Sequence, residues 1–371
     1  MAYDVVVAGL GGFGSAAAHH LSRRGLRVLG LDPRPPAHAE GSSHGESRIV
    51  RQVYYEGAVY VPLLRRTYEL WARLTRDDGA PMLRTTGGLF LGGEGTRVLD
   101  GSIATAREWD LEHEVLAPAE VARRFPAVRP PEGTLALYEP QAGVVEPEAA
   151  VSAHLRLAAA AGADLRHDEA VTGWSASDDT VAVTTTRGSH RAGALVLAPG
   201  RWAPDLLCGL DLPLTVERRV QHWFRPPDPA GFAPGRLPVW LWDLGGGTSM
   251  YGTPSLGPAA GPGAVKVAVH FSGDRPADAW TPAEVAAAAG GLLPGLGDDH
   301  RRAADCWYTL TPDEHFVVGP HPASELVVLA CGFSGHGFKF TPVLGSVIAD
   351  LVTDGRTELD ISALSPTRFA G

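Results

Sequence analysis

Asp4-Val5-Val6-Val7-Ala8-Gly9-Leu10-Gly11-Gly12-Phe13-Gly14 is the stretch of the chain that decides the fold. Its first five residues predict a short buried strand, and the glycines that follow predict a tight turn. Residues 15–25 then have the pattern of a helix that ends at a glycine, and residues 27–31 predict a second strand that ends at Asp32. Glycines between a strand and a helix, with an acid after the next strand, are a strong sign of a βαβ unit that binds a dinucleotide.

The glycines of this fingerprint have separate tasks. Gly9 allows the tight turn, Gly11 lets a pyrophosphate approach the backbone, and Gly14 lets the helix lie close to the strand. The start of the helix then faces the pyrophosphate, and we expect Asp32 to bind the adenosine ribose. The fingerprint alone fits NAD as well as FAD.

The chain is long enough for two domains, because its 371 residues exceed the roughly 250–300 residues at which one hydrophobic core stops growing. Segments of Rossmann type occur at the start, in the middle and at the end of the chain, and strand-rich segments lie between them. We predict an α/β dinucleotide-binding domain of residues 1–85, 147–215 and 315–371, and a β-rich substrate domain with a mixed sheet of residues 86–146 and 216–314. Both domains are therefore discontinuous in sequence. Beyond the first unit, helices are expected over residues 61–74, 146–161 and 343–351, and strands over residues 181–186, 194–198, 214–224, 239–242, 249–251, 265–271 and 326–330.

Composition excludes several classes of function. The net charge of -10 argues against a nucleic-acid partner, which needs a basic stripe. No apolar run reaches the roughly 18–20 residues that span a bilayer, and the sequence from Met1 predicts a strand rather than a signal peptide. The three cysteines, Cys208, Cys306 and Cys331, suit neither a disulfide framework nor a metal cluster. We therefore expect a cytoplasmic protein that binds no metal, no nucleic acid and no membrane.

Three further segments carry motifs. They are Gly41-Ser42-Ser43-His44-Gly45-Glu46-Ser47-Arg48-Ile49-Val50-Arg51, Cys306-Trp307-Tyr308-Thr309-Leu310-Thr311-Pro312-Asp313-Glu314 and Gly332-Phe333-Ser334-Gly335-His336-Gly337-Phe338-Lys339. Together with the fingerprint they resemble the monomeric sarcosine oxidase and N-methyltryptophan oxidase family over nearly the whole chain. The resemblance implies FAD rather than NAD, a monomer, and a small amino-acid substrate that is oxidised with O2.

The resemblance also implies how the cofactor is held. Cys306 matches the cysteine that forms a thioether with the flavin 8α carbon, and since a thiolate must attack, we expect a cation beside it. Arg48 would lie near the flavin ring, with His44 in the same loop. Cys208 and Cys331 are expected in the core. The full set of expected cofactor contacts is Gly9, Gly11, Gly14, Asp32, Ser42, Ser43, Arg51, Val171, Cys306, Gly335, Gly337, Phe338 and Lys339.

For the substrate, the resemblance implies that Arg51 and Lys339 bind a carboxylate. Lys266 matches the lysine that activates oxygen, where a cation stabilises developing negative charge, and His270 lies two pleats along the same strand. Tyr251 and Tyr308 match residues of the substrate cavity. Plainer interpretations exist for several of these residues: a surface ion pair for Arg48 and Arg51, a solvated strand position for Lys266, a small buried hydrophobe for Cys306 and core packing for the tyrosines.

The implied activity is an FAD-dependent oxidase of secondary or cyclic α-amino acids. A hydride equivalent passes from the amine carbon to flavin N5, the imine hydrolyses, and O2 becomes H2O2. The alternatives are a flavin-dependent amino-acid dehydrogenase with another electron acceptor and an NAD-dependent dehydrogenase. The long connection before Lys266, rich in glycine and proline, and three tryptophans, Trp223, Trp240 and Trp242, predict a pocket larger than sarcosine needs.

Overall fold

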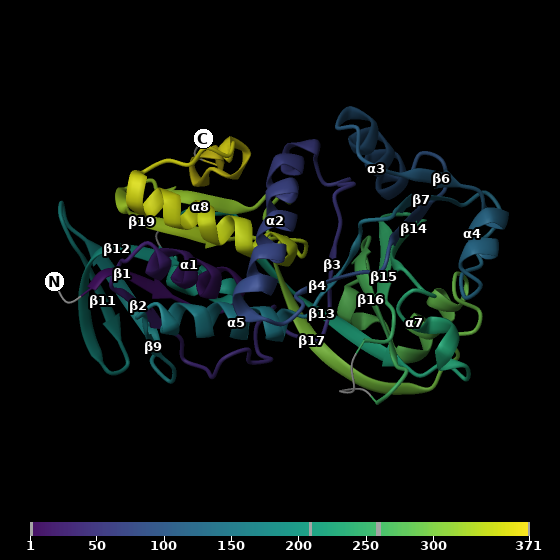
Figure 1. The fold of residues 1–371 in the computed structure, drawn as a ribbon, viewed down its shortest axis with the longest axis horizontal. Coiled ribbons are helices and arrows are strands. Elements are labelled where there is room, and N and C mark those ends of the chain that lie inside the picture. The colour runs from purple at the N-terminus through teal and green to yellow at the C-terminus, as the bar shows by residue number, and fades with distance from the viewer. Residues whose placement is uncertain (1–2, 208–209, 257–260, 370–371) are drawn as a thin grey trace.

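The computed structural model of the chain describes residues 3–207, 210–256 and 261–369. Two units, each built on an eight-stranded sheet, lie side by side, and a three-stranded sheet lies between them (Figure 1). The helices are α1 (Gly12–Arg23), α2 (Val61–Asp78), α3 (Arg97–Glu108), α4 (Pro118–Arg124), α5 (Pro147–Ala160), α6 (Ala203–Leu206), α7 (Pro282–Gly290) and α8 (Thr341–Asp354), with 3-10 turns η1 (Ala58–Tyr60), η2 (Gly200–Trp202), η3 (Pro229–Phe232), η4 (Ala277–Ala279), η5 (Phe338–Phe340), η6 (Ser362–Leu364) and η7 (Pro366–Phe369). The strands are β1 (Tyr3–Ala8), β2 (Val28–Leu31), β3 (Arg48–Val50), β4 (Leu83–Thr85), β5 (Gly88–Gly92), β6 (Glu114–Leu116), β7 (Leu135–Glu139), β8 (Gly143–Val145), β9 (Asp164–Arg166), β10 (Val171–Ala176), β11 (Val181–Thr185), β12 (Gly188–Leu197), β13 (Thr215–Phe224), β14 (Val239–Gly245), β15 (Thr248–Thr253), β16 (Val265–Ser272), β17 (His300–Leu310), β18 (Val317–His321) and β19 (Ser324–Cys331).

The first sheet has a parallel centre in the order β9-β2-β1-β12-β19. The inner strands β1 and β2, and the parts of β12 and β19 that pair in parallel, are apolar on both faces, as parallel strands covered on both sides must be. Val5 and Val7 face a core shared with α1, α2, α5 and α8, whereas Val6 and Ala8 face a second core closed by the antiparallel strands β10 and β11. The glycine fingerprint therefore lies at the centre of the sheet, where β1 ends and α1 begins.

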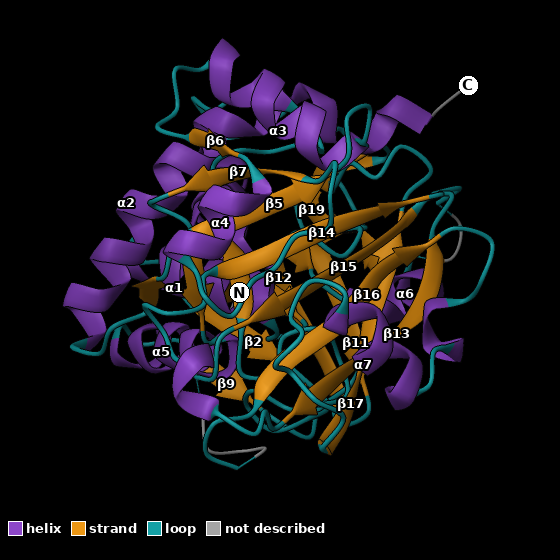
Figure 2. Cartoon of the chain, turned by 90° about the vertical axis from the view of Figure 1, so that its right-hand side faces the viewer, coloured by secondary structure: helices purple, strands orange, loops and turns teal. Residues whose placement is uncertain are grey.

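The second sheet runs in the order β17-β13-β16-β15-β14-β5-β7-β6. Its neighbours are antiparallel except for the parallel pair β14 and β5. Helices α4 and α7 contribute to the core on one face of this sheet, and α3 contributes to the core on its other face (Figures 1 and 2). Strand β16 is buried on both faces from Val265 to His270, so alternation along it does not separate solvent from core.

Each sheet is assembled from pieces of chain that are distant in sequence, so the predicted fold class is confirmed. The first collects β1 and β2, then β9 to β12, then β18 and β19, and the second collects β5 to β7 and β13 to β17. Strand β8 pairs with β3 and β4, so the exact domain boundaries stay a prediction. The predicted elements all occur, but α2 extends to Asp78 and β12 begins as early as Gly188. Many of the other elements were not predicted, among them α3, α7, β7, β10 and β17. Within the described ranges no helix is long and apolar enough to cross a membrane.

Candidate active site

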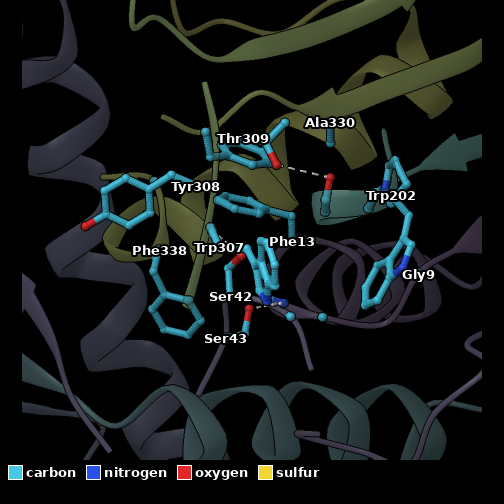
Figure 3. A pocket seen from close by; sticks show the side chains of 18 of the residues that line it. Gly9, Phe13, Ser42, Ser43, Trp202, Trp307, Tyr308, Thr309, Ala330 and Phe338 are labelled. Atoms are coloured by element: carbon cyan, nitrogen blue, oxygen red, sulfur yellow. Dashed lines mark hydrogen bonds between the residues drawn. The ribbon is translucent and has the colours of Figure 1, made fainter. Parts of the chain in front are cut away.

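A cavity of about 720 Å³ extends from the turn between β1 and α1 to the middle of β17. Figure 3 shows Gly9 and Trp202 on one side of it and Tyr308 on the other, with Phe13 and Trp307 between them. Its walls come from both units. Of the expected cofactor contacts, those that line the cavity are Gly9, Gly11, Asp32, Ser42, Ser43, Arg51, Val171, Cys306, Gly335, Gly337, Phe338 and Lys339.

The fingerprint turn has the backbone geometry that its glycines predict. Gly9 has φ +91°, and a Cβ there would lie 2.4 Å from the Ala198 carbonyl oxygen. A Cβ on Gly14 would lie 1.7 Å from the Gly9 oxygen, so Gly14 serves the close approach of helix and strand and does not line the cavity. Asp32 accepts the Leu10 N–H at 2.8 Å and the Arg34 N–H at 2.9 Å. These bonds fix the carboxylate at the end of β2.

The start of α1 fits a phosphate group. Gly11 is the N-cap and supplies no side chain, and Gly12 N–H donates to Ser43 Oγ at 3.1 Å (Figure 3). The neighbouring Ser42 Oγ donates to the Trp307 carbonyl at 2.6 Å and so ties this loop to β17. Unpaired N–H groups and the helix dipole at such an end favour an anion, so the turn, the two serines and Asp32 suit a dinucleotide such as FAD.

Cys306 lies at the far end of the cavity, beside a cation. Its Sγ is 3.5 Å from Nη2 of Arg48. The same guanidinium donates to the carbonyls of Ser42 and Ser47, at 2.7 Å each, so it is held against the sulfur by the loop that also carries Ser43. The arrangement provides the cation that a reacting thiolate needs.

Arg51 is buried and already has an anionic partner, which the sequence analysis missed. Its Nη2 donates to both carboxylate oxygens of Glu56 at 2.6 Å, and the two side chains are only 5% and 3% exposed. Burial raises the pKa of Glu56, but Arg51, His336 and Lys339 outweigh burial and lower it to about 2. The interpretation of Arg51 as a surface ion pair is therefore wrong, because the pair is inside the cavity wall.

Lys339 is the second cation at this end. Its Nζ donates to the His336 carbonyl at 2.6 Å and lies 3.4 Å from the Tyr54 hydroxyl. Burial, and then the nearby Arg51, lower its pKa to about 7. An ammonium has three N–H donors, so one remains for a ligand in the cavity.

His270, Tyr308 and Tyr251, from strands β16, β17 and β15, form one wall of the cavity. His270 Nδ1 and the Tyr308 hydroxyl are 3.0 Å apart, and the rings of His270 and Tyr251 meet edge to face. Burial lowers the pKa of His270 to about 3 and raises that of Tyr251 to about 12. The wall is therefore uncharged near neutral pH. Gly335, with φ +79°, passes so close to the Tyr308 ring that a Cβ would lie 2.2 Å from it.

Lys266 and His44 lie behind the cavity wall rather than in it. Lys266 is 1% exposed, and its Nζ donates to the carbonyls of Gly45 and Ser47 at 3.0 and 2.6 Å. Burial, and then Arg48, hold its pKa well below the ordinary value. Burial and then Arg48 also lower the pKa of His44 to about 4. Lys266 is thus not a solvated strand residue, and its amino group is held by the loop that carries Gly45 and Ser47.

The three tryptophans expected to enlarge the pocket do not line it, and that prediction of the sequence is wrong. Trp240 and Trp242 pack in the core of the second unit, and Trp223 stacks beneath Arg302. The tryptophans on the cavity wall are Trp202 and Trp307 instead. Residues 257–260 of the long connection and Cys208 lie outside the described residues, whereas Cys331 is fully buried in the core as expected.

One signal in the sequence was overlooked. Of the 32 lysines and arginines, only Lys266 and Lys339 are lysines, and both are buried at this site. All the other side chains of this kind are arginines, so the two lysines stand out in the sequence as positions that have a compact ammonium in place of a planar guanidinium. Glu56 carried no comparable signal, because the path of the loop decides which side chain faces Arg51.

The fold and the cavity define a class of oxidoreductase in which a dinucleotide-binding sheet and a second sheet share one cavity. The profile of the family described as FAD dependent oxidoreductase matches residues 4–351. The chain belongs to this family, and FAD is its cofactor.

Full-length relatives agree. The chain is 45% identical to monomeric sarcosine oxidase of Streptomyces avermitilis, over 99% of this chain and 98% of that one. It is 32% identical to N-methyl-L-tryptophan oxidase of Salmonella heidelberg, over the whole of both chains. Among solved structures it is similar to NikD, an amino acid oxidase of nikkomycin biosynthesis, with a TM-score of 0.83, 29% identity, and 98% and 97% of the two chains covered.

Proposed function

We propose that the protein is an FAD-dependent oxidase of N-methylated, secondary or cyclic α-amino acids. The observation that carries the proposal is the pair of buried cations, Arg51 and Lys339, at the end of the cavity that Cys306 and Tyr308 mark. Two cations there suit a carboxylate. The relatives named above are named for N-methylated amino acids, which agrees with this chemistry.

A bound substrate would place its carboxylate between Lys339 and Arg51. Lys339 has a free donor. Arg51 uses Nη2 for Glu56 and one Nη1 hydrogen for the Val53 carbonyl, so a substrate carboxylate would either share the guanidinium with Glu56 or displace Glu56 from it. A carboxylate fixed at this end holds the amine and its neighbouring carbon in one orientation. Such positioning lowers the activation barrier of a reaction between two bound groups by a large amount. The uncharged wall of His270 and Tyr308 suits the neutral amine from which oxidation must start.

The redox chemistry belongs to the flavin, which takes a hydride equivalent from the amine carbon and passes two electrons to oxygen. The chain's own share is to bind, to orient and to supply charge. Cys306, beside Arg48, would hold the flavin through a thioether. Lys266, next to the same loop, would stabilise the negative charge that develops on oxygen when its amino group is protonated in the reduced enzyme.

Covalent attachment is tested by mass. Denatured wild-type protein should be heavier than its sequence by one FAD, and Cys306→Ser should lose that mass. Cys331→Ser is the matched control, because Cys331 is equally buried but packs in the core of the first unit. Flavin that leaves the wild-type protein on denaturation contradicts attachment without touching the oxidase activity.

The function is tested by anaerobic reduction of the flavin. We expect sarcosine, N-methyltryptophan, proline or pipecolate to reduce it, and the matched amines without a carboxylate to reduce it far more slowly. Because Arg51 stays paired with Glu56 when an amine binds, the preference for amino acids over the matched amines should arise mainly at Lys339. Efficient reduction by the amines contradicts the carboxylate clamp. Reoxidation by air with release of peroxide separates an oxidase from a dehydrogenase that uses another acceptor.

A further inference from the structure

Tyr54 lies where the two cations of the proposed clamp meet. Its side chain is fully buried. Its ring centroid is 4.4 Å from the guanidinium carbon of Arg51 and 4.9 Å from Nζ of Lys339. An aromatic face attracts cations, more strongly when they are desolvated. One ring therefore stabilises two like charges that repel each other.

The direction of the hydrogen bonds around Tyr54 can be deduced. His336 Nε2 lies 3.0 Å from the Glu314 carbonyl, which can only accept, so Nε2 carries the ring proton. Burial lowers the pKa of His336 to about 3, so the ring is neutral and its Nδ1 must accept. Nδ1 is hydrogen-bonded to the Tyr54 hydroxyl, whose other acceptor, the His336 carbonyl, is farther away at 3.4 Å. The hydroxyl therefore donates to His336, and its oxygen is left to accept from Lys339.

We propose that Tyr54, oriented by His336, is the positioning residue that keeps the Lys339 ammonium charged and aimed at the substrate carboxylate. This inference rests on the proposed function, because it assigns a task within the same clamp. The ordered chain runs from Lys339 through Tyr54 to His336 and ends at the Glu314 carbonyl. The Trp71 indole, which donates to the Lys339 carbonyl at 3.0 Å, fixes the backbone at the other end.

The groups that face Lys339 determine in which direction its pKa changes when the Tyr54 hydroxyl is removed. Arg51 disfavours its charge and Glu56 favours it, while Tyr54 and the His336 carbonyl accept hydrogen bonds from it. His336 itself is neutral. Loss of the Tyr54 oxygen removes an acceptor that favours the charged form and leaves burial and Arg51 unchanged. The ammonium should then lose its proton at a lower pH, and carboxylate affinity should decline from a lower pH.

The experiment titrates the holoenzyme with acetate, a carboxylate without an amine, and follows the flavin absorbance between about pH 6 and pH 9, the range that brackets a group titrating near neutrality. Tyr54→Phe should weaken acetate binding by about tenfold, the scale of one hydrogen bond to a charged group, and should move the alkaline decline to lower pH. With substrate, KM should rise while kcat changes little. Tyr60→Phe is the matched control, because Tyr60 is equally buried, its ring contacts that of Tyr54, and its hydroxyl binds His315 instead.

Each outcome decides the question. A Tyr54→Phe enzyme with wild-type acetate affinity and pH dependence overturns the positioning role while the clamp stands. Equal weakening in Tyr54→Phe and Tyr60→Phe overturns it too, because the cluster would then act only through packing. Wild-type enzyme that does not bind acetate overturns both the clamp and this inference. His336→Leu removes the acceptor of Tyr54 and should shift the same pH decline, which supplies the test if Tyr54→Phe does not accumulate.

Discussion

At the scale of single residues, Glu56 has an unusual position. It is a carboxylate of the chain itself that binds the arginine proposed for a substrate carboxylate. With no ligand, Glu56 satisfies Arg51, whose charge would otherwise be buried without a partner at a cost of roughly 3–5 kcal/mol. The same contact competes with the substrate. Glu56 therefore balances the stability of the free enzyme against its affinity for an amino acid.

Glu56→Gln should lower KM for an amino-acid substrate, because an amide competes less well than a carboxylate for Arg51. It should also lower the free energy of unfolding by about 3 kcal/mol, the lower end expected for breaking a buried ion pair. Steady-state kinetics and urea unfolding measure the two effects. Glu69→Gln, which disrupts the exposed pair with Arg66, should change the free energy of unfolding by less than about 1 kcal/mol. A raised KM in Glu56→Gln would show that Glu56 assists binding.

Lys266→Met removes a buried amine and keeps its length. We expect the rate of flavin reduction to change modestly. Reoxidation by oxygen should slow because its activation barrier rises by about 3–4 kcal/mol, the size found when a group that stabilises charge in a transition state is removed. Because burial and Arg48 hold the Lys266 pKa low, wild-type reoxidation should slow with rising pH well before an ordinary lysine would titrate. Lys339→Met should instead raise KM and leave reoxidation unchanged. Stopped-flow mixing with oxygen separates the two, and wild-type reoxidation in Lys266→Met would exclude the role.

Part of this site could be predicted from the sequence, and part could not. Gly9 and Gly14 have tasks that depend on local backbone geometry, and the structure has them where the fingerprint predicts. The pairing of Arg51 with Glu56 depends on the path of an irregular loop, which no periodic pattern encodes. Trp240 was misread because its strand is buried on both faces, so an aromatic residue there faces a core as easily as a cavity.

At the scale of elements, α1 and α5 meet through a pair of histidines. His19 Nδ1 and His154 Nδ1 are 3.0 Å apart and both side chains are buried. One ring must donate to the other, so at most one Nδ1 carries a proton while both rings are neutral. Burial, and then Arg23, lower the pKa of His19 to about 4, and burial and then His19 hold the pKa of His154 well below its ordinary value. Helix α1 is thus held by groups that must stay uncharged.

This pair should make stability depend on pH. In the unfolded chain both histidines bind protons below about pH 6.5, whereas the folded pair resists them, so stability is present above that pH and is lost as pH falls toward 4. The slope is about 1.4 kcal/mol per pH unit for each histidine. A double variant, His19→Leu with His154→Leu, should lose this part of the slope in urea unfolding measured at several pH values. Identical slopes in both proteins would show that the pair titrates normally.

Strand β17 illustrates which elements could not be predicted. It carries Cys306, yet its first half alternates exposed and half-buried residues and has no apolar pattern. Its existence depends on pairing with β13 over the whole length of that strand. By contrast β1, β2 and β19 are short apolar runs beside glycines, and their sequences alone predict strands.

At the scale of the whole molecule, the cofactor cavity takes its walls from both units, so FAD bound there would contact both. The discontinuous arrangement was predictable because Rossmann-type and strand-rich segments alternate along the chain. The pairing of strand β8 with β3 and β4 between the units was not predictable, because strands of three residues have almost no sequence pattern.

A ligand that binds only the folded protein stabilises it in proportion to the logarithm of its concentration. Wild-type protein with covalent flavin should therefore have a melting temperature that does not change with added FAD. In Cys306→Ser the melting temperature should rise with FAD, by the equivalent of about 1.4 kcal/mol for each tenfold increase above the dissociation constant, and should not respond to NAD. Calorimetry measures both. Equal responses to FAD in the two proteins would contradict covalent attachment.

The burial of both lysines has a consequence for the outer surface. Every basic side chain that the folded protein presents to solvent, histidine aside, is a guanidinium, and a guanidinium keeps its charge throughout the accessible pH range. Amine-directed labels, crosslinkers and solid supports that couple through lysine therefore find no ε-amino group on the exterior. A small reagent such as cyanate, which attacks the uncharged amine, would find its lysine target at Lys339, where the cavity gives access and the proton is weakly held. Carbamylation of this protein would thus act as a probe of its interior, and a carboxylate in the cavity should protect against it.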